Sequence, residues 1–118
     1  MPTLQPGQLA HINIFTPKPG MMDDFINAQL QGLPTFGEIP GSRGSLFYRA
    51  KDDSHVILIS LFEDEAAHRR FMDTPAFHHH RQRLMPLLEG TKPGYYTLTY
   101  SRDGAPEEKS LTIAGAAD

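Results

Sequence analysis

The sequence predicts an α+β domain whose strands and helices follow in the order βαββαβ. Three observations predict this class. Residues 9–15 alternate apolar and other side chains at period two, two later stretches carry apolar residues at helical spacing, and a short polar turn joins two apolar runs in mid-chain. The chain has 118 residues, which is enough for one core but not for two domains.

The N-terminal part predicts one strand followed by one helix. The strand covers residues 9–15, and Pro17 follows it closely. From Met21 the apolar spacing becomes helical, with acidic residues favourably placed in the first turn. Gly32 and Pro34 weaken the end of this helix.

The middle of the chain predicts a hairpin. A turn at Pro40 and Gly41 precedes two apolar runs at residues 45–49 and 55–62. Only the polar segment 51–54 separates these runs, and a connection this short joins adjacent antiparallel strands.

The C-terminal part predicts a helix in two pieces and a last strand. The first piece runs from about Glu63 to about Phe71, and the helix restarts at Asp73-Thr74-Pro75, because threonine can cap a helix and proline suits its first position. The second piece is predicted to end at Gly90, and the last strand covers residues 95–101. One face of the second piece carries Phe77, Arg81, Leu84 and Leu88.

This order is typical of ferredoxin-like domains, in which a four-stranded antiparallel sheet carries two helices on one face. The third strand is nonetheless apolar at nearly every position, and Tyr96, Leu98 and Tyr100 form an apolar row on the fourth. A sheet that is apolar on both faces needs a second layer. We therefore expect a homodimer that packs through its sheets. The alternative is a monomer whose C-terminal tail folds over the open face.

Composition excludes several classes of protein. With 14 acidic against 11 basic residues, the chain has no electrostatic footprint for nucleic acid or an anionic membrane. The absence of cysteine excludes disulfides, iron–sulfur clusters and cysteine-based zinc sites. No apolar run is long enough to cross a membrane, and residues 1–10 lack the pattern of a secretory signal, so a cytoplasmic protein is expected.

Several segments in a fixed order make the chain recognisable. They are PGSRGSLFYR at 40–49, ILISLFEDEAAHRRF at 57–71, DTPAFHHHRQRL at 73–84 and LLEGTKPGYYTL at 87–98. Their order and spacing resemble the antibiotic biosynthesis monooxygenase family of dimeric α+β barrels. The resemblance covers about residues 9–101 and implies one domain over residues 1–101, followed by a tail at 102–118 that is flexible or crosses to the partner subunit.

The resemblance also implies an activity. Members that are enzymes oxidise phenols, anthrones or quinols with dioxygen and need no flavin or metal, a side branch degrades haem, and other relatives bind small molecules. Singlet organic molecules react slowly with triplet dioxygen, so a cofactor-free oxygenase must ionise its substrate and use it as the reductant. Such a site needs an apolar pocket, a donor or cation for the substrate's oxygen, and a base.

Four residues are the candidates for this chemistry: Arg81, Asn13, His68 and His80. Arg81 matches an arginine of the quinone-forming members and would hold an enolate or carboxylate; the alternative is that it reaches solvent or pairs with an acidic residue. Asn13 matches a pocket asparagine of the haem-degrading branch, or is a satisfied polar group of the sheet. His68 matches a pocket tyrosine and would be a base, although its local sequence favours a surface position. Apolar residues expected to line the pocket are Phe15, Leu58, Phe62, Phe71, Phe77 and Leu84.

The three histidines at 78–80 do not predict a metal site. Consecutive helical residues point about 100° apart, whereas two ligands on a helix need a spacing of three or four. His78 and His79 are therefore expected to face water. His80 alone shares the face of Phe77 and Leu84, which makes it the second candidate base.

The function predicted from this pattern is a cofactor-independent monooxygenase for a small electron-rich aromatic compound. The alternative is a non-catalytic dimer that binds a small hydrophobic ligand, favoured because Phe62 and Leu58 replace a tryptophan and an asparagine of the quinone-forming members. A haem-binding or haem-degrading protein is a further alternative. It would require His80 to turn inward, because Arg81 stands where that branch has its axial histidine.

Overall fold

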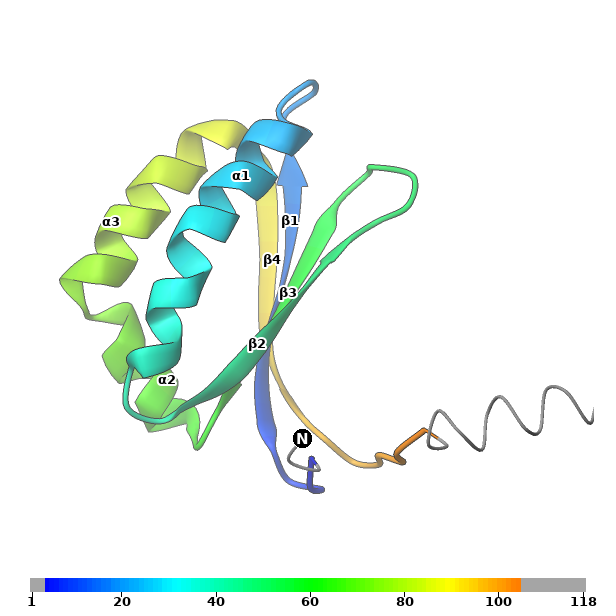
Figure 1. Cartoon of the computed structure of the whole chain (residues 1–118), viewed down its shortest axis with the longest axis vertical. Coiled ribbons are helices and arrows are strands. Elements are labelled where there is room, and N and C mark those ends of the chain that lie inside the picture. Colours follow the sequence, from blue (N-terminus) through cyan, green and yellow to red (C-terminus); the bar gives the residue numbers. More distant parts are fainter. Residues whose placement is uncertain (1–3, 105–118) are drawn as a thin grey trace, which may run out of the picture.

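Within residues 4–104, which the computed structural model describes, four antiparallel strands form one sheet and three α-helices cover one of its faces (Figure 1). The strand order across the sheet is β2-β3-β1-β4, so the first strand lies in the interior and the last at an edge. This topology confirms the predicted ferredoxin-like α+β fold. The strands are β1 (Leu9–Pro17), β2 (Ser42–Arg49), β3 (Val56–Phe62) and β4 (Leu88–Thr97). The helices are α1 (Met22–Gly32), α2 (Glu65–Met72) and α3 (Pro75–Leu84), with short 3₁₀ helices at Leu33–Glu38 and Met85–Leu87.

The predicted break between the two C-terminal helices is confirmed and has a local cause. The Asp64 side chain caps α2 by accepting a hydrogen bond of 2.8 Å from the backbone N–H of Ala67. Thr74 caps α3 in the same way, accepting from the N–H of Phe77 at 3.2 Å, and Pro75 occupies the first helical position. Two caps ten residues apart therefore start two separate helices rather than one.

The end of the second piece is predicted incorrectly. Helix α3 ends at Leu84 and a 3₁₀ turn follows, so Leu88 and Gly90 belong to β4 instead of the helix. The cause is Pro86, which has no N–H to donate and whose ring clashes with the preceding turn of an α-helix. The last strand consequently begins earlier than predicted and ends at Thr97. Leu98 and Tyr100 of the expected apolar row lie beyond it, although Leu98 still exchanges backbone hydrogen bonds with the segment before β1.

Strand β1 divides its side chains between the two faces of the sheet. Phe15 packs on the helix side, with its ring centroid 5.2 Å from that of Phe25 on α1, and both residues are buried. Since successive side chains of a strand alternate, His11 and Asn13 lie on the same face as Phe15. The opposite face carries Ala10, Ile12 and Ile14.

The face of the sheet opposite the helices is apolar and uncovered in the single chain. On it, Ile12 lies in register with Ile59 of β3, which in turn pairs with Leu46 of β2. Tyr48 and Tyr96 flank this row from the two edge strands and are 55% and 54% exposed. The face is thus the apolar surface from which the sequence predicts a second layer. Figure 1 shows no helix on this side of the sheet within the described residues.

Two expectations concern the remainder of the chain. The predicted tail begins at residue 102, but residues 105–118 lie outside the described residues. In the part of the chain that the structure describes, none of the helices combines the length and the apolar character needed to span a membrane.

Gly32 allows α1 and α3 to approach each other. It is buried, and a Cβ built on it overlaps the imidazole ring of His80. Glycine-to-alanine changes near the end of a helix are ordinarily neutral or stabilising. Here we expect Gly32→Ala to lower the free energy of unfolding by about 1–3 kcal/mol, because the ring is packed in the core and cannot move aside. Urea unfolding measures the difference.

Gly90→Ala is the matched control for this substitution. Its Cβ would meet no atom within 4 Å, so the variant should unfold like the wild type. Equal stability of Gly32→Ala and the wild type would contradict the close contact.

Candidate functional site

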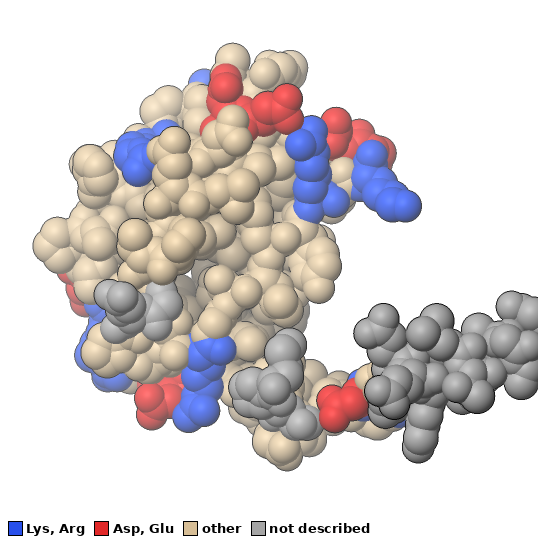
Figure 2. Space-filling view, viewed as in Figure 1, with Lys and Arg blue, Asp and Glu red and all other residues tan. Residues whose placement is uncertain are grey.

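A cavity of about 440 Å³ lies between the sheet and the helices. All four strands and all three helices of the described chain contribute to its walls. In the space-filling view a hollow opens in the middle of the face, and the surface around it is mostly uncharged (Figure 2). A volume of this size is typical of sites for small organic ligands.

The structure brings all of the predicted site residues to this cavity. Its lining includes the candidate polar residues Arg81, Asn13, His68 and His80. It also includes the predicted apolar residues Phe15, Leu58, Phe62, Phe71, Phe77 and Leu84. Their individual roles stay predictions. The structure does show that these residues, which come from two strands and two helices, line one cavity.

Phenylalanine rings form one apolar wall of the cavity. Phe71 is the centre of this wall, with ring centroids 5.7 Å from Phe62, 5.0 Å from Phe77 and 4.9 Å from Phe36. The last two contacts are edge-to-face, an arrangement that aromatic rings favour. Phe36 was not predicted, because it lies in the 3₁₀ helix after α1, where no periodic pattern marks it. A wall of this kind suits a flat aromatic ligand.

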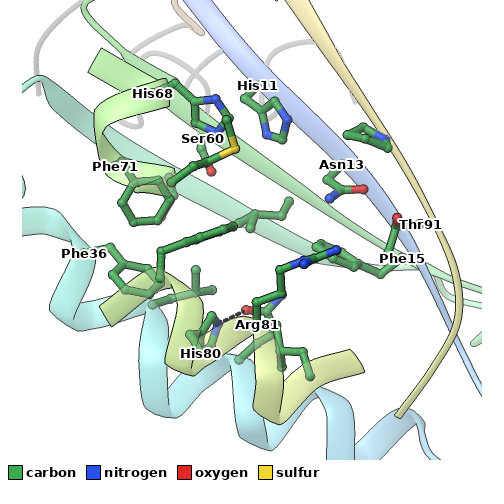
Figure 3. Close-up of a pocket in the computed structure, with 18 of the residues that line it drawn as sticks. His11, Asn13, Phe15, Phe36, Ser60, His68, Phe71, His80, Arg81 and Thr91 are labelled. Carbon is green, nitrogen blue, oxygen red and sulfur yellow. Dashed lines mark hydrogen bonds between the residues drawn. The ribbon is translucent and has the colours of Figure 1, made fainter. Parts of the chain in front are cut away.

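Arg81 lines the cavity from α3 and is also exposed, so its side chain lies where the cavity meets solvent. Figure 3 shows the guanidinium pointing into the cavity towards the sheet. Within the described residues it forms no ion pair. Its charge is permanent. It is therefore a cation available to an anionic oxygen of a ligand.

Asn13 faces the cavity from β1. Its Oδ1 atom is buried and has no hydrogen-bond partner within the described chain. Buried polar atoms are nearly always paired, so an acceptor in a cavity wall that no group of the described chain engages is available to a donor on a ligand. The satisfied arrangement that the sequence left open as an alternative is not observed for this atom.

His80 is turned inward and buried, but both of its ring nitrogens are constrained. Its Nε2–H donates to Oε1 of Gln29 at 2.8 Å, and its Nδ1 lies against Gly32 without a hydrogen-bond partner among the described residues. Burial, followed by the charges of Arg83 and His79, lowers the pKa of His80. His80 is therefore a neutral residue held in place by α1, and Gln29 is a partner that no sequence pattern indicated.

His68 is buried at 3% exposure, so the surface position favoured by its local sequence is wrong. The ring of Phe62 packs edge-on against it, with centroids 4.9 Å apart. Its Nδ1 forms a hydrogen bond of 2.7 Å with the hydroxyl of Tyr95 on β4. The ring of His11 stacks on it, with centroids 4.1 Å apart and an interplanar angle of 26°.

The environment of this cluster keeps both histidines neutral. Burial and the proximity of His11 lower the pKa of His68 to about 4. Burial also lowers the pKa of His11. The pKa of Tyr95 is raised by burial and by the nearby carboxylate of Glu65, so its hydroxyl keeps its proton at neutral pH.

The residues that line the cavity give it a definite electrostatic character. They include one permanent cation, Arg81, and no carboxylate from the described part of the chain. The described residues also contain no cluster of three potential metal ligands. Neutral histidines and one cation suit a ligand that carries its negative charge on oxygen.

Comparison with known families now places the chain. The model of the antibiotic biosynthesis monooxygenase family matches residues 9–83, which span strands β1 to β3 and most of the helices. The protein belongs to this family. No curated protein matches the chain.

Solved structures share the fold. The chain is similar to SnoaB, a cofactor-independent oxygenase from Streptomyces nogalater, with 24% identity over 86% of this chain and 99% of that one and a TM-score of 0.69. It is also similar to PA3566 from Pseudomonas aeruginosa, with 17% identity over 83% and 100% of the two chains and a TM-score of 0.72. Protein SO0527 from Shewanella oneidensis gives 21% identity over 81% and 95%, with a TM-score of 0.70. At these identities the likeness establishes the fold alone.

The burial of His68 predicts a loss of stability in acid. A histidine with a pKa near 6.5 in the unfolded chain and about 4 in the folded chain binds its proton more readily when unfolded. The free energy of unfolding should therefore fall as the pH falls from 6.5 towards 4, by on the order of 3 kcal/mol from His68 alone. His68→Phe should make this fall shallower, as measured by urea unfolding across that range.

His78→Gln is the control, because His78 lies on α3, is exposed and does not line the cavity. It should retain the acid sensitivity of the wild type. If the free energy of unfolding of His68→Phe fell as steeply between pH 6.5 and 4 as that of the wild type, His68 would not be buried as a neutral ring.

Proposed function

We propose that the protein is a cofactor-independent monooxygenase that oxidises a small electron-rich aromatic compound, a phenol, an anthrone or a quinol, with dioxygen. Membership of the family supports a monooxygenase-type function. The observation that carries the proposal is the cavity itself, in which a wall of phenylalanine rings faces one arginine and no described carboxylate. For an anthrone, the reaction turns the ring methylene into a carbonyl. One oxygen atom of dioxygen enters the product, and the other leaves as water with the two hydrogens of the methylene.

The residues present have distinct tasks in this reaction. Arg81 binds a substrate oxygen by charge and hydrogen bonding and stabilises the negative charge that ionisation spreads over the ring system, which makes the electron-rich anion accessible at neutral pH. The amide of Asn13 completes the hydrogen bonding of the bound substrate. The phenylalanine wall holds the flat ring system and excludes water, which limits side reactions of the activated oxygen species.

The protein is proposed to act as a homodimer. The apolar face formed by Ile12, Ile59, Leu46 and the two exposed tyrosines is larger than the scattered apolar residues that monomers expose. A second copy of the same sheet would cover it with an identical face, as a twofold interface requires. A cytoplasmic location is part of the same proposal.

One observation favours a non-catalytic binding protein as the second candidate. Phe62 and Leu58 line the cavity where the quinone-forming relatives carry polar or indole side chains. Apolar side chains at these positions retain affinity for an aromatic ligand, but they offer no polar group that could direct the reaction with dioxygen. Haem binding through His80 has less support, because Gln29 already occupies its Nε2 atom.

The oxygenase proposal is tested by oxygen consumption. The purified protein, free of flavin and metal, should consume dioxygen with at least one member of a panel of anthrones and hydroquinones. Arg81→Met should lower kcat/KM by roughly 10- to 100-fold, the size expected from losing a charged hydrogen bond to the substrate oxygen. Arg83→Met is the matched control, because Arg83 lies on the same helix but outside the cavity lining.

The same experiment separates the two candidates. Protection of the protein from thermal unfolding by these compounds, without oxygen consumption, would support the binding protein. Equal activity of Arg81→Met and the wild type would remove Arg81 from the site.

The dimer is tested by sedimentation. The wild type should sediment at twice the chain mass of 13.2 kDa. Ile59→Lys places a charge in the middle of the apolar face and should give the mass of a single chain at micromolar concentration. Gln82→Lys, on the exposed side of α3, should stay dimeric. A wild type of one chain mass would contradict the dimer.

A further inference from the structure

The cavity has two polar ends with different chemistry. Figure 3 places His11 and His68 at one end and Arg81 and His80 at the other. The sequence predicts two candidate bases, His68 from the family resemblance and His80 from the helix face that it shares with Phe77 and Leu84. In the structure Nδ1 of His68 is engaged by Tyr95 and Nε2 of His80 by Gln29, while Nδ1 of His80 has no partner among the described residues but is buried against Gly32.

The tautomer of His68 follows from its partner. A phenol is a much stronger acid than a neutral imidazole, and an imidazole nitrogen is a much better acceptor than a phenol oxygen. In the 2.7 Å contact the hydroxyl of Tyr95 is therefore the donor, and Nδ1 of His68 is the acceptor. A neutral ring that accepts at Nδ1 carries its own proton on Nε2. His68 thus offers the cavity an N–H donor and no lone pair.

His11 is in the opposite situation. It lines the cavity from β1, between Ser60 of β3 and Tyr95 of β4, and it is only partly buried. No hydrogen bond within residues 4–104 engages its ring nitrogens. One of the two nitrogens of a neutral imidazole always carries a free lone pair. The unpaired Nδ1 of His80 is buried against Gly32, so His11 is the histidine of this cavity that is placed to accept a proton from a ligand.

Stacking couples the two rings. With centroids 4.1 Å apart, the rings repel each other when both are charged, so the pair accepts one proton rather than two. His68 is the more deeply buried of the two, and its remaining nitrogen is already protonated. The charged groups that act on Tyr95 are Glu65 and Arg69 of α2, which have opposite effects on its pKa and pair with each other at 2.7 Å. The first proton therefore goes to His11.

We propose that His11 is the general base of the cavity and that His68, oriented by Tyr95, is the hydrogen-bond donor to the oxygen that His11 deprotonates. The chemistry rests on the proposed function. In this step the O–H bond of a phenol or enol breaks, its proton forms an N–H bond on His11, and the electron pair stays on the oxygen. That oxygen then accepts a hydrogen bond from Nε2–H of His68. Tyr95 is a positioning residue, because it acts on the ligand only through His68.

The first test needs no ligand and no activity. Nitrogen-15 NMR of the histidine rings distinguishes protonated from unprotonated nitrogens. In the wild type we expect His68 as a single tautomer with its proton on Nε2, and we expect His11 to take up a proton at higher pH than His68. Tyr95→Phe removes the donor and should give His68 a mixture of both tautomers. Tyr96→Phe is the matched control, because the next side chain of β4 lies on the other face of the sheet, and it should leave the spectrum unchanged.

The second test concerns proton transfer. Alizarin, a hydroxyanthraquinone, changes colour when its phenol ionises, so its absorption reports the charge of the bound form. The wild type should ionise alizarin at a lower pH than free solution does, and His11→Gln should lose this shift. With an oxidisable anthrone, His11→Gln should lower kcat by roughly 100-fold or more, the lower range for loss of a general base.

These tests can support or overturn the assignment of His11 whether or not the protein is an oxygenase. A protein that ionises alizarin through His11 but consumes no oxygen would refute the oxygenase and leave the assignment of His11 intact. Ionisation of alizarin by the wild type no greater than by His11→Gln would overturn the assignment of the base. A proton on Nδ1 of His68 in the free wild type, or protonation of His68 before His11, would overturn the division between donor and base, even if His11→Gln does not fold.

Discussion

Strand β1 imposes the constraint on which the rest of the molecule depends. It is hydrogen-bonded on both sides, to β3 and to β4, so its register fixes the positions of every neighbouring side chain. Because strand side chains alternate, the same nine residues must supply both the polar floor of the cavity and the middle of the apolar outer face. A shift by one residue would exchange His11 and Asn13 with Ile12 and Ile14. A change in the register of β1 would therefore disrupt the cavity and the apolar outer face at the same time.

Much of the fold could be predicted from the sequence because it depends on local periodicity. Alternation in β1, the polar turn before β3 and the cap at Thr74 each act over a few residues, and each is present in the structure. The error at the end of α3 has the same origin. The helical spacing of apolar residues continues through Leu88, and this longer pattern concealed the effect of one proline at position 86.

The site was predicted in its membership but not in its interactions. Every predicted residue lines the cavity, because each lies on an inward face or matches a family position. Contacts across the fold are different, since Tyr95 is 27 residues from His68, and Gln29 is 51 residues from His80. No local pattern encodes such pairs. The burial of His68 did have a signal, because it precedes Phe71 by three residues and so shares the inward face of α2.

These contacts determine which of the histidines in the cavity can donate a proton to a ligand and which can accept one. Counted in the sequence, His68 and His80 are two equivalent candidates for a base; in the fold, Tyr95 makes one of them a donor and Gln29 anchors the other. The role of proton acceptor is left to His11. The sequence alone did not show which face of the sheet His11 lies on, so it gave this residue no role. Arg81 is at the other end of the cavity, so deprotonation and charge stabilisation do not act at a single atom. A ligand that engages both ends needs oxygen on both sides of a flat ring system. This requirement favours quinols and hydroxylated anthrones over simple phenols, which leave one polar end of the cavity unsatisfied.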